Sequence, residues 1–291
     1  MYKCIRLNNI NIKFLKKLNG RRYIFNTLNE NFFDIYNTSN FAQRILLRKR
    51  VYLLSYDSNY VGYLWFTPNN KYNYTINALN IVYYTNINLK KACSLLLNSL
   101  KINATFNFHC ENNGFNFKIL KQLGFSNVSG VLKLSLLLNK SFNFKFNNDE
   151  ISFSSLKLGS EENIRCYIQN TVFKNPNRVP LTIEDIFYDE NQNYYFDRGS
   201  ILVKKKDTYI GYGQIIIQNN IPIIVNVGIL NSYRGKGYGE ELLKYLINIL
   251  KIEGFKKAYI NVDMNNTIAL NLYKKLGFKI KSEKCIWEIK R

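Results

Sequence analysis

The chain repeats part of its own pattern, and this repeat limits the folds open to it more than any other feature. The run Lys-Gln-Leu-Gly-Phe at 121–125 returns as Lys-Lys-Leu-Gly-Phe at 274–278. Tyr-Val-Gly-Tyr at 60–63 returns as Tyr-Ile-Gly-Tyr at 209–212. The glycines of the first pair are 153 residues apart and those of the second pair 149. Two anchors with nearly equal offsets indicate two copies of one domain.

The boundary between the copies is predicted at a polar break, Asn-Asn-Asp-Glu at 147–150. We therefore expect one domain at residues 1–147 and a second at 148–291. Each copy shows the same coarse order of elements. In the second copy, strand-like runs lie at 151–156, 200–205, 209–218, 221–230, 258–262, 278–281 and 285–289, and helix-like runs at 161–173, 182–191, 241–253 and 266–276. This order predicts a mixed sheet with helices on its faces.

A glycine-rich turn, Arg-Gly-Lys-Gly-Tyr-Gly at 234–239, follows the β-branched run 223–230 and precedes an amphipathic helix. A strand that leads through glycines into a helix exposes main-chain N–H groups and the positive end of the helix dipole. Glycine reaches positive φ at little cost and lets an anion approach the main chain. The turn therefore predicts a phosphate-binding site.

Two nucleotide-binding patterns fit this turn poorly. It lacks the Gly-Lys-Ser/Thr ending of an NTPase phosphate loop. Its glycines also lack the Gly-x-Gly-x-x-Gly spacing of a dinucleotide-binding fold. A flexible glycine hairpin without a ligand is the remaining alternative.

The turn and a second segment together resemble the GNAT superfamily of acyl-CoA-dependent N-acyltransferases. In that family Arg/Gln-x-x-Gly-x-Gly/Ala cradles the coenzyme A pyrophosphate, and Asn-x-x-Ala-x-x-Leu-Tyr-x-x-x-Gly-Phe follows. Residues 234–239 and 266–278 fill every position of these patterns. The resemblance implies an α/β (α+β) fold of two tandem GNAT-like domains, each a mixed, mainly antiparallel twisted sheet flanked by helices. It also implies acetyl-CoA as co-substrate and no metal.

The resemblance assigns roles to individual residues. It implies that Ile229, Leu230, Arg234, Gly235, Lys236, Gly237, Tyr238, Gly239 and Asn266 bind the coenzyme. Tyr273 matches the tyrosine that protonates the departing thiolate in many members, and a phenol stays protonated at neutral pH. Packing on an apolar helix face is the alternative for Tyr273, and a helix N-cap is the alternative for Asn266.

The general base and the acceptor are not identified by the sequence. Many relatives have a glutamate on the strand before the turn, where this chain has Asn226 and Gly228. Candidates for the base are Asp263, Glu184, Asp185 or a chain of water molecules. The family's acceptor pocket is built mainly from the first helices and their loop, here about 173–189, with tyrosines 188, 194 and 195 as further stacking surface.

These features lead us to expect an N-acetyltransferase that transfers an acetyl group from acetyl-CoA to a primary amine of a small molecule. The amine is expected to attack directly in a ternary complex. One alternative is acetylation of a protein or peptide amine. Another is a non-catalytic protein that senses acyl-CoA or binds partners through its basic surface.

The first copy differs from the second where chemistry is expected. Alignment places Lys90 near the position of Gly237 and Ala92 near that of Gly239. Leu120 stands where the second copy has Tyr273. We therefore expect a degenerate domain that keeps the fold and loses the coenzyme site, and one acetyl-CoA per chain.

Composition narrows the class of protein. Lysine and arginine number 41 against 20 aspartates and glutamates, a formal net charge of +21. Such charge favours polyanions, but the basic residues are scattered, and nucleic-acid binders concentrate them on one face. Abundant Lys, Asn, Ile, Tyr and Phe indicate A/T-rich codon usage instead. We therefore do not expect nucleic acid as a partner.

The cysteines and the histidine argue against three further kinds of site. The five cysteines form no Cys-x-x-Cys pair, and His109 is the single histidine. This argues against a disulfide framework, a zinc site and a histidine-based triad. The sequence contains no apolar run of about 18 residues, the length of a membrane span, and its strand-like N-terminus lacks a signal-peptide core. We expect a cytoplasmic protein with reduced, mostly buried cysteines and no membrane partner.

Overall fold

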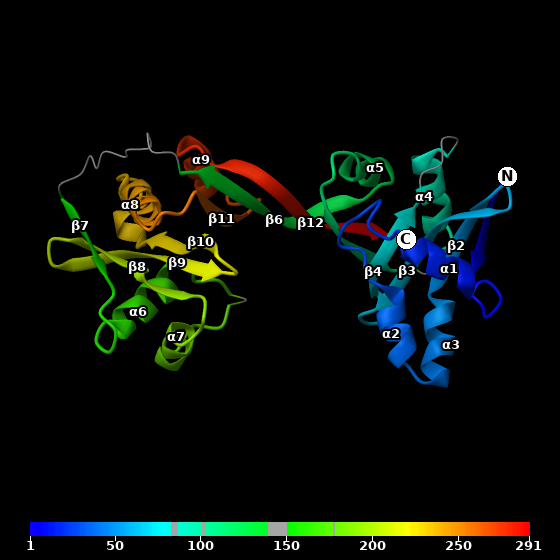
Figure 1. The fold of residues 1–291 in the computed structure, drawn as a ribbon, viewed down its shortest axis with the longest axis horizontal. Helices are drawn as coiled ribbons and strands as arrows, with labels where there is room; N and C mark the ends of the chain where they lie inside the picture. Colours follow the sequence, from blue (N-terminus) through cyan, green and yellow to red (C-terminus); the bar gives the residue numbers. More distant parts are fainter. Residues whose placement is uncertain (83–86, 101–102, 139–149, 177) are drawn as a thin grey trace. The chain divides into compact units, whose positions relative to one another are not determined.

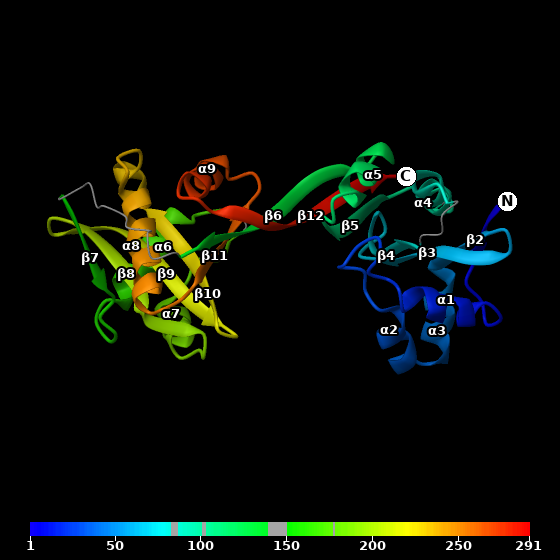
Figure 2. The same ribbon diagram turned by 45° about the horizontal axis from the view of Figure 1, so that its top comes forward.

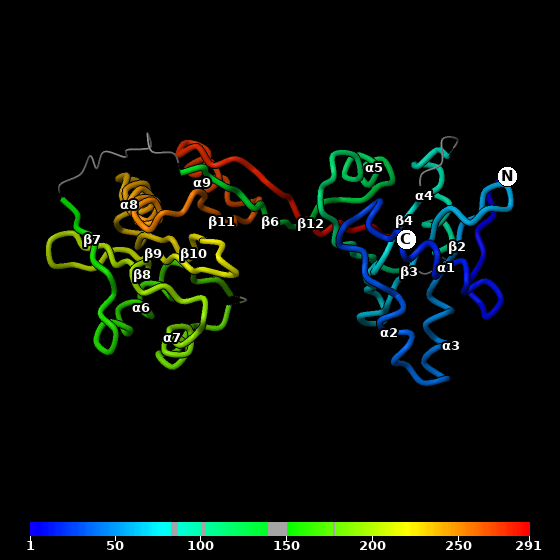
Figure 3. The backbone as a smooth tube through the Cα atoms, in the orientation of Figure 1, coloured from blue at the N-terminus to red at the C-terminus, as the bar shows by residue number. Residues whose placement is uncertain are grey.

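The computed structural model describes residues 1–82, 87–100, 103–138, 150–176 and 178–291, and Figure 3 traces their path. The chain forms two compact units. Unit 1 comprises residues 1–131, 263–265 and 282–291, and unit 2 comprises residues 132–262 and 266–281. The predicted boundary between residues 147 and 148 lies outside the described residues.

Unit 1 has helices on both faces of its sheet (Figure 2). On one face, α1, α2 and α3 pack against β2 and β3, and on the other α4 and α5 cover the sheet. Its elements are β1 (Tyr2–Arg6), α1 (Ile12–Asn19), α2 (Phe32–Thr38), α3 (Phe41–Lys49), β2 (Val51–Tyr56), β3 (Asn59–Pro68), β4 (Asn73–Ile81), α4 (Leu89–Leu97), β5 (Thr105–Glu111), α5 (Asn116–Gln122) and the first part of β6 (Ser126–Leu137).

Unit 2 follows the same order with one helix fewer before its meander. α8 packs on one face of β8, β9 and β10, and α6 and α7 lie on the other (Figure 1). Its elements are β7 (Ile151–Ser155), α6 (Glu162–Val172), α7 (Ile183–Glu190), β8 (Tyr195–Lys205), β9 (Thr208–Gln218), β10 (Ile221–Ile229), the 3-10 turn η1 (Asn231–Tyr233), α8 (Tyr238–Ile252), β11 (Lys257–Asp263), α9 (Thr267–Lys275) and the start of β12 (Lys279–Lys290).

The sheets are mixed, which confirms the predicted fold class. Strand order is β1-β2-β3-β4-β5-β12-β6 through unit 1 and β6-β11-β10-β9-β8-β7 through unit 2. β4 runs parallel to β5, and β10 runs parallel to β11. The meanders β1–β4 and β7–β10 are antiparallel.

Each unit is completed by a strand from the other half of the sequence. The end of β12 pairs antiparallel with β5 in unit 1, where Cys285 faces Cys110 and Trp287 faces Phe108. The end of β6 belongs to unit 2, where the N–H of Leu138, just beyond the strand, donates to the carbonyl of Lys256 (2.9 Å). Each unit therefore contains residues from both halves of the sequence.

The last strand is longer than the sequence suggests. Two strands predicted at 278–281 and 285–289 are one continuous β12. The intervening polar run Lys-Ser-Glu-Lys contains no glycine, proline, asparagine or aspartate, and its serine favours turns only weakly. Polarity alone was therefore a poor turn signal.

The repeat is visible in side-chain packing. A Cβ on Gly62 would lie 2.4 Å from Cδ1 of Ile81, and a Cβ on Gly211 would lie 2.4 Å from Cδ1 of Ile229. In each unit a glycine thus lets an isoleucine at the end of the neighbouring strand fold over it. The same close approach in both units follows from the Tyr-x-Gly-Tyr signature.

The core of unit 2 reflects strand and helix periodicity. Successive side chains of β9 face opposite sides: Tyr212 packs in the cluster with Ile168 of α6, and a Cβ on Gly213 would meet Leu242 and Leu246 of α8. The apolar stripe of α8 is buried as predicted. In the part of the chain that the structure describes, we find no helix with the length and apolarity that crossing a bilayer requires.

Candidate functional site

Strand β10 is irregular just before the glycine turn. Its pairing with β9 shifts register between Val225 and Gly228, and Asn226 has a positive φ of 54°. Asparagine tolerates this left-handed conformation better than most residues. A Cβ on Gly228 would lie 2.3 Å from Cγ1 of Val172, so glycine allows α6 to pack closely on the bulge.

The two parallel strands of unit 2 stay paired only briefly. Ile223 and Ile224 of β10 pair with Tyr259 and Ile260 of β11. Beyond this pairing, β10 continues to Ile229 and β11 to Asp263. In unit 1 the corresponding pairing extends over 73–76 of β4 and 105–108 of β5. Past the last parallel pair, β10 and β4 each continue for five residues, 225–229 and 77–81, so both units leave this end of the strand without a parallel neighbour.

The glycine turn has the backbone geometry that anion binding needs. Gly235 and Gly237 have φ of 78° and 84°, and Gly237 is the N-cap of α8. Open space surrounds the position of an added Cβ at either glycine. The main-chain N–H groups from Gly235 to Gly239 have no hydrogen-bond acceptor within the described residues. These N–H groups and the start of a 15-residue helix form a ready cradle for a diphosphate.

The side chains of the turn have distinct places. Arg234 donates from Nε to the carbonyl of Ile229 (2.9 Å), which ties the turn to the end of β10. Lys236 is exposed beside the ring of Tyr233. Tyr238 is buried, and its hydroxyl donates to Glu150 (2.9 Å) and accepts from Lys205 (3.0 Å). The side chain of Tyr238 is therefore engaged elsewhere, and only its main-chain N–H is available at the turn.

Two glutamates in the first turn of α8 are neutralised by lysines. Lys244 lies 3.3 Å from Glu240 and 2.8 Å from Glu241, and Lys275 also pairs with Glu240. The hydrogen bond from Lys275 is the main reason that the pKa of Glu240 is lowered. Because these lysines compensate the two carboxylates, Glu240 and Glu241 only partly cancel the positive end of the helix dipole.

The main-chain N–H groups of Ile229 and Leu230 point to opposite sides of β10. The N–H of Leu230 donates to the carbonyl of Ile210 on the β9 side (2.8 Å). Because strand N–H groups alternate in direction, that of Ile229 points to the side of β11, beyond the short parallel pairing. Both side chains are buried.

The second motif places Asn266 and Tyr273 at the two ends of α9. The Asn266 side chain accepts from the N–H of Ala269 (3.1 Å), which confirms the capping alternative for Asn266. Tyr273 is 8% exposed, and its ring lies 6.0 Å from that of Phe278. Burial raises the pKa of Tyr273 to about 12. The phenol is therefore protonated at neutral pH and can donate a hydrogen bond. Among the residues described, its hydroxyl has no hydrogen-bond partner.

In the described residues of unit 1, the helix that corresponds to α8 begins differently. Helix α4 begins at Leu89 with Asn88 as N-cap, whose side chain accepts from the N–H of Lys91 (3.0 Å). Lys90, predicted near the position of Gly237, lies inside α4 two residues after the N-cap Asn88, whereas Gly237 is itself the N-cap of α8. Asn88 has a negative φ and itself occupies one of the N–H groups that an anion would need.

A cavity of about 490 Å³ lies between α6, α7 and the bulge of β10. Its walls hold acidic, basic, amide and aromatic side chains: Arg165, Gln169, Arg178, Val179, Pro180, Leu181, Asp185, Ile186, Tyr188, Asp189, Tyr194 and Asn226. This is the region where the acceptor pocket was expected. Of the candidate bases, Asp185 lines the cavity, but it is exposed and its carboxylate accepts from the N–H of Thr182 (2.8 Å). Glu184 is also exposed, and Asp263 accepts from the N–H of Asn265 (2.7 Å).

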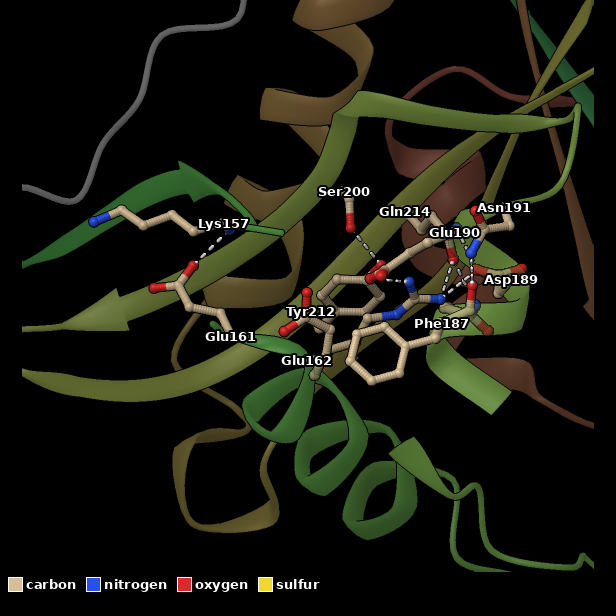
Figure 4. Close-up of polar contacts among 12 residues, drawn as sticks. Lys157, Glu161, Glu162, Phe187, Asp189, Glu190, Asn191, Ser200, Tyr212 and Gln214 are labelled. Carbon is tan, nitrogen blue, oxygen red and sulfur yellow. Dashed lines mark hydrogen bonds and ion pairs between the residues drawn. The ribbon is translucent and has the colours of Figure 1, made fainter. Parts of the chain in front are cut away.

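The buried guanidinium of Arg165, which lines this cavity, joins α6 to α7. Figure 4 shows its partners Asp189, Glu190 and Gln214 close together. Arg165, 2% exposed, donates to Asp189 and lies 3.5 Å from Glu190. Gln214 donates to Asp189 (3.0 Å) and accepts from Asn226 (3.0 Å). Burial alone would raise the pKa of Asp189, but hydrogen bonds from Arg165, Gln214 and Tyr194 hold it below the ordinary value. The bulge is thereby tied to α6 and α7.

Sequence reasoning missed this network. Arg165, Gln214 and Gln169 belonged to a predicted helix and a predicted strand without any assigned role. A charged residue between apolar neighbours of α6 was the one available signal. Its partners are 24 and 49 residues away along the chain, so no local pattern connects them.

Comparison with known proteins identifies the domain. Residues 168–278 match the acetyltransferase (GNAT) family. This part of the chain is a GNAT domain. The matched range contains the bulge, the glycine turn, α8 and the Asn266–Phe278 motif, so the family pattern and the geometry coincide.

Curated relatives match a short segment of the chain. A mycothiol acetyltransferase of Corynebacterium aurimucosum is 36% identical over 61 residues, which is 21% of this chain and 20% of that protein. An N-alpha-acetyltransferase of Sulfurisphaera tokodaii is 39% identical over 57 residues, which is 19% of this chain and 34% of that protein. The matches thus span a fifth to a third of these relatives.

Solved structures match over nearly the whole chain. A GCN5-related N-acetyltransferase from Sphaerobacter thermophilus aligns with 99% of this chain and 95% of its own, with a TM-score of 0.57 and 13% identity. A GNAT-family acetyltransferase from Colwellia psychrerythraea aligns with 99% and 100%, with a TM-score of 0.50 and 10% identity. At this identity the likeness concerns the fold. The GNAT fold extends over both units, as the internal repeat predicted.

Proposed function

We propose that the protein is an N-acetyltransferase that moves an acetyl group from acetyl-CoA to a primary amine of a small molecule. The observation that carries this proposal is the turn at 234–239. Its main-chain N–H groups have no partner among the described residues, two of its glycines have positive φ, and it begins a long helix within a GNAT domain. The open space over Gly235 and Gly237 fits a diphosphate, so the residues present suit coenzyme A.

The proposed division of labour follows from the geometry. N–H groups from Gly235 to Gly239 hold the diphosphate, and Lys236 adds a mobile positive charge. The N–H of Ile229 faces the gap beside β11 and is the donor we assign to the pantetheine arm or thioester oxygen. We assign Leu230 and Asn266 to the same arm of the coenzyme. Holding both reactants in line supplies a large part of the rate enhancement.

The reaction needs one proton donor and one proton acceptor. The amine lone pair forms the C–N bond while the C–S bond breaks, and the sulfur leaves with the bonding electrons. Tyr273 is the proposed acid that protonates the sulfur, because its side chain is buried and its phenol is neutral at pH 7. The proton of the amine passes to water. A carboxylate base is not required by this scheme.

The acceptor is proposed to be small because the cavity beside the bulge has the volume of a small-molecule site. The coenzyme is proposed to bind in unit 2 alone, since Asn88 replaces the glycine cap in unit 1. A cytoplasmic location is part of the proposal and agrees with five unpaired cysteines.

Calorimetry with acetyl-CoA and thiol release over a panel of small amines and peptides test the proposal. We expect one tight coenzyme site per chain and release with small amines. Release with peptides alone would favour the protein-acetylating alternative. Binding without release on any acceptor would favour a sensing protein, and no binding at all would refute the coenzyme site.

A further inference from the structure

Two carboxylates and two guanidinium groups line the cavity beside α6 and α7: those of Asp185, Asp189, Arg165 and Arg178. Three of these four groups already have partners within unit 2. Arg165 donates to Asp189, and Asp185 accepts from the N–H of Thr182 at the start of α7 (2.8 Å). Among the charged groups of the cavity wall, the guanidinium of Arg178 is therefore the one that a ligand can engage without breaking an existing pair.

The guanidinium of Arg178 packs over an aromatic ring. Its central carbon lies 5.3 Å from the centre of the Phe173 ring, and the side chain is half-buried. No carboxylate of the described residues forms an ion pair with it. A guanidinium that lies over a ring keeps the N–H groups of its edge free, and these form a planar fork that matches a carboxylate. Arg178 is thus prepared to bind a carboxylate.

A second group of the cavity wall has no partner. Gln169 lines the same cavity, is 2% exposed, and its Oε1 has no hydrogen-bond partner within the described residues. A buried acceptor without a donor is unfavourable. A primary amine has N–H groups before acyl transfer, and the amide product keeps one. The oxygen of Gln169 can therefore bind the acceptor nitrogen before and after the reaction.

We propose that the cavity takes an acceptor that carries a carboxylate as well as its primary amine, that is, a small amino acid, with the carboxylate bound by Arg178 and the amine by Gln169. This inference rests on the proposed acetyltransferase function. An acceptor with a second ammonium is disfavoured, because the carboxylate of Asp189 is already paired with Arg165. The other carboxylate, that of Asp185, lies at the start of α7, where the helix dipole offsets its charge.

The bond changes are those of the proposed reaction and need no further reactant. The neutral nitrogen forms the C–N bond, the C–S bond breaks, and the sulfur takes a proton from Tyr273. The nitrogen loses a proton to water, and Tyr273 regains one from water. The carboxylate of the acceptor forms and breaks no covalent bond. Arg178 therefore determines specificity, and its removal should change the preference among acceptors.

Thiol release by the full-length protein tests the inference. With saturating acetyl-CoA, kcat/KM is measured for ω-amino acids from glycine to 6-aminohexanoate, for alkylamines and diaminoalkanes of matching length, and for a short peptide. We expect the best amino acid to exceed its alkylamine by about tenfold or more, the effect of a hydrogen bond between charged groups. Added NaCl should reduce this ratio.

Variants of Arg178 locate the effect. Arg178→Gln should lower the ratio of amino acid to alkylamine by about tenfold, and Arg178→Glu should make the matching diaminoalkane a better acceptor than the amino acid. Arg198→Gln is the matched control, because Arg198 belongs to the same unit, is 75% exposed and pairs with Glu253 outside the cavity. Its ratio should equal that of the wild type.

Gln169→Leu separates the two ends of the acceptor. Amino acids and alkylamines present the same nitrogen, so this change should lower kcat/KM for both by a similar factor and leave their ratio as it is. A changed ratio would overturn the assignment of Gln169 to the amine. If Arg178→Gln fails to fold, calorimetry on the wild-type chain saturated with coenzyme A replaces it, and the amino acid should bind about tenfold more tightly than the alkylamine.

Two kinds of failure can be told apart. Equal kcat/KM values for amino acids and alkylamines, or a preference for diaminoalkanes or peptide, would overturn the carboxylate assignment and leave the acetyltransferase function standing. An amino-acid preference that survives Arg178→Gln, or that falls equally in Arg198→Gln, would also overturn it. Absence of coenzyme binding and of thiol release with every acceptor would overturn the proposed function, and this inference with it.

Discussion

Replacing Gly237 tests the phosphate cradle most directly. Its φ of 84° is a conformation that an L-residue adopts at a penalty of about 1–2 kcal/mol. Gly237→Ala should therefore lower the melting temperature by a few degrees, roughly 2–4 °C per kcal/mol for a chain of this size. It should also weaken coenzyme binding, because a methyl group enters the space above the N–H groups.

Gly237→Asp adds charge to the same position. A carboxylate about 4 Å from one phosphate charge is unfavourable by ~4 kcal/mol at an effective dielectric constant of 20. That corresponds to a loss of affinity of about a thousandfold. Calorimetry with coenzyme A on the folded variants measures both losses.

Gly254 provides the matched control for backbone strain. It ends the same helix with a φ of 80° and has the same open surroundings. Gly254→Ala should cause a similar loss of stability and leave coenzyme affinity unchanged. Equal affinities of the wild type, Gly237→Ala and Gly237→Asp would refute the assignment of this turn to the diphosphate.

Three further outcomes are expected. Tyr273→Phe should keep coenzyme affinity but lower kcat by about 10²–10⁴, measured where chemistry limits the rate; an unchanged kcat would leave Tyr273 a packing role only. Because burial raises the pKa of Tyr273 to about 12, the acid stays protonated and kcat should not fall between pH 7 and about 10; a descending limb near pH 8 that vanishes in Tyr273→Phe would contradict this. Gly228→Ala should destabilise unit 2 by about 1–3 kcal/mol in denaturant unfolding, since its Cβ would meet Val172 at 2.3 Å.

The order of elements in each unit could be predicted because it depends on local periodicity. The stripe of α8, for example, is a 3.6-residue pattern, and Gly254 ends that helix at the predicted place. The glycine turn was equally readable, since positive φ leaves few alternatives to glycine. Turn polarity was less reliable, as the uninterrupted β12 shows.

The cavity network could not be predicted because its members meet only in the folded unit. Arg165 is on α6, Asp189 on α7 and Gln214 on β9. Each has an unremarkable neighbourhood in the sequence. Their importance comes from burial, which makes an unpaired charge so unfavourable that partners must be found across elements. Sequence patterns do not report that constraint.

The sequence also did not predict that the end of β12 belongs to unit 1 and the end of β6 to unit 2. Hydrophobic alternation identifies a strand but does not say which sheet the strand joins. We call this arrangement strand exchange. It leads to a prediction that a simple division into halves would not make. Residues 282–291 belong to unit 1, and Trp287 and Ile289 lie in its core at 1% and 6% exposure. Removing these last residues should therefore unfold unit 1, at the opposite end of the sequence, and leave the turn and α8 of unit 2 folded.

Hydrogen exchange read by mass spectrometry distinguishes the two units. In a chain ending at Lys281, protection should be lost in β2–β5 and retained in β9 and α8. Trp287→Ala is the milder form of the test, with an expected loss of about 3–5 kcal/mol in the unfolding of unit 1, and an exposed matched position, Ile268→Ala on α9, should change neither unit. Loss of protection in unit 2 alone would show that the C-terminal strand serves the half of the sequence in which it is encoded, and the exchange would be refuted.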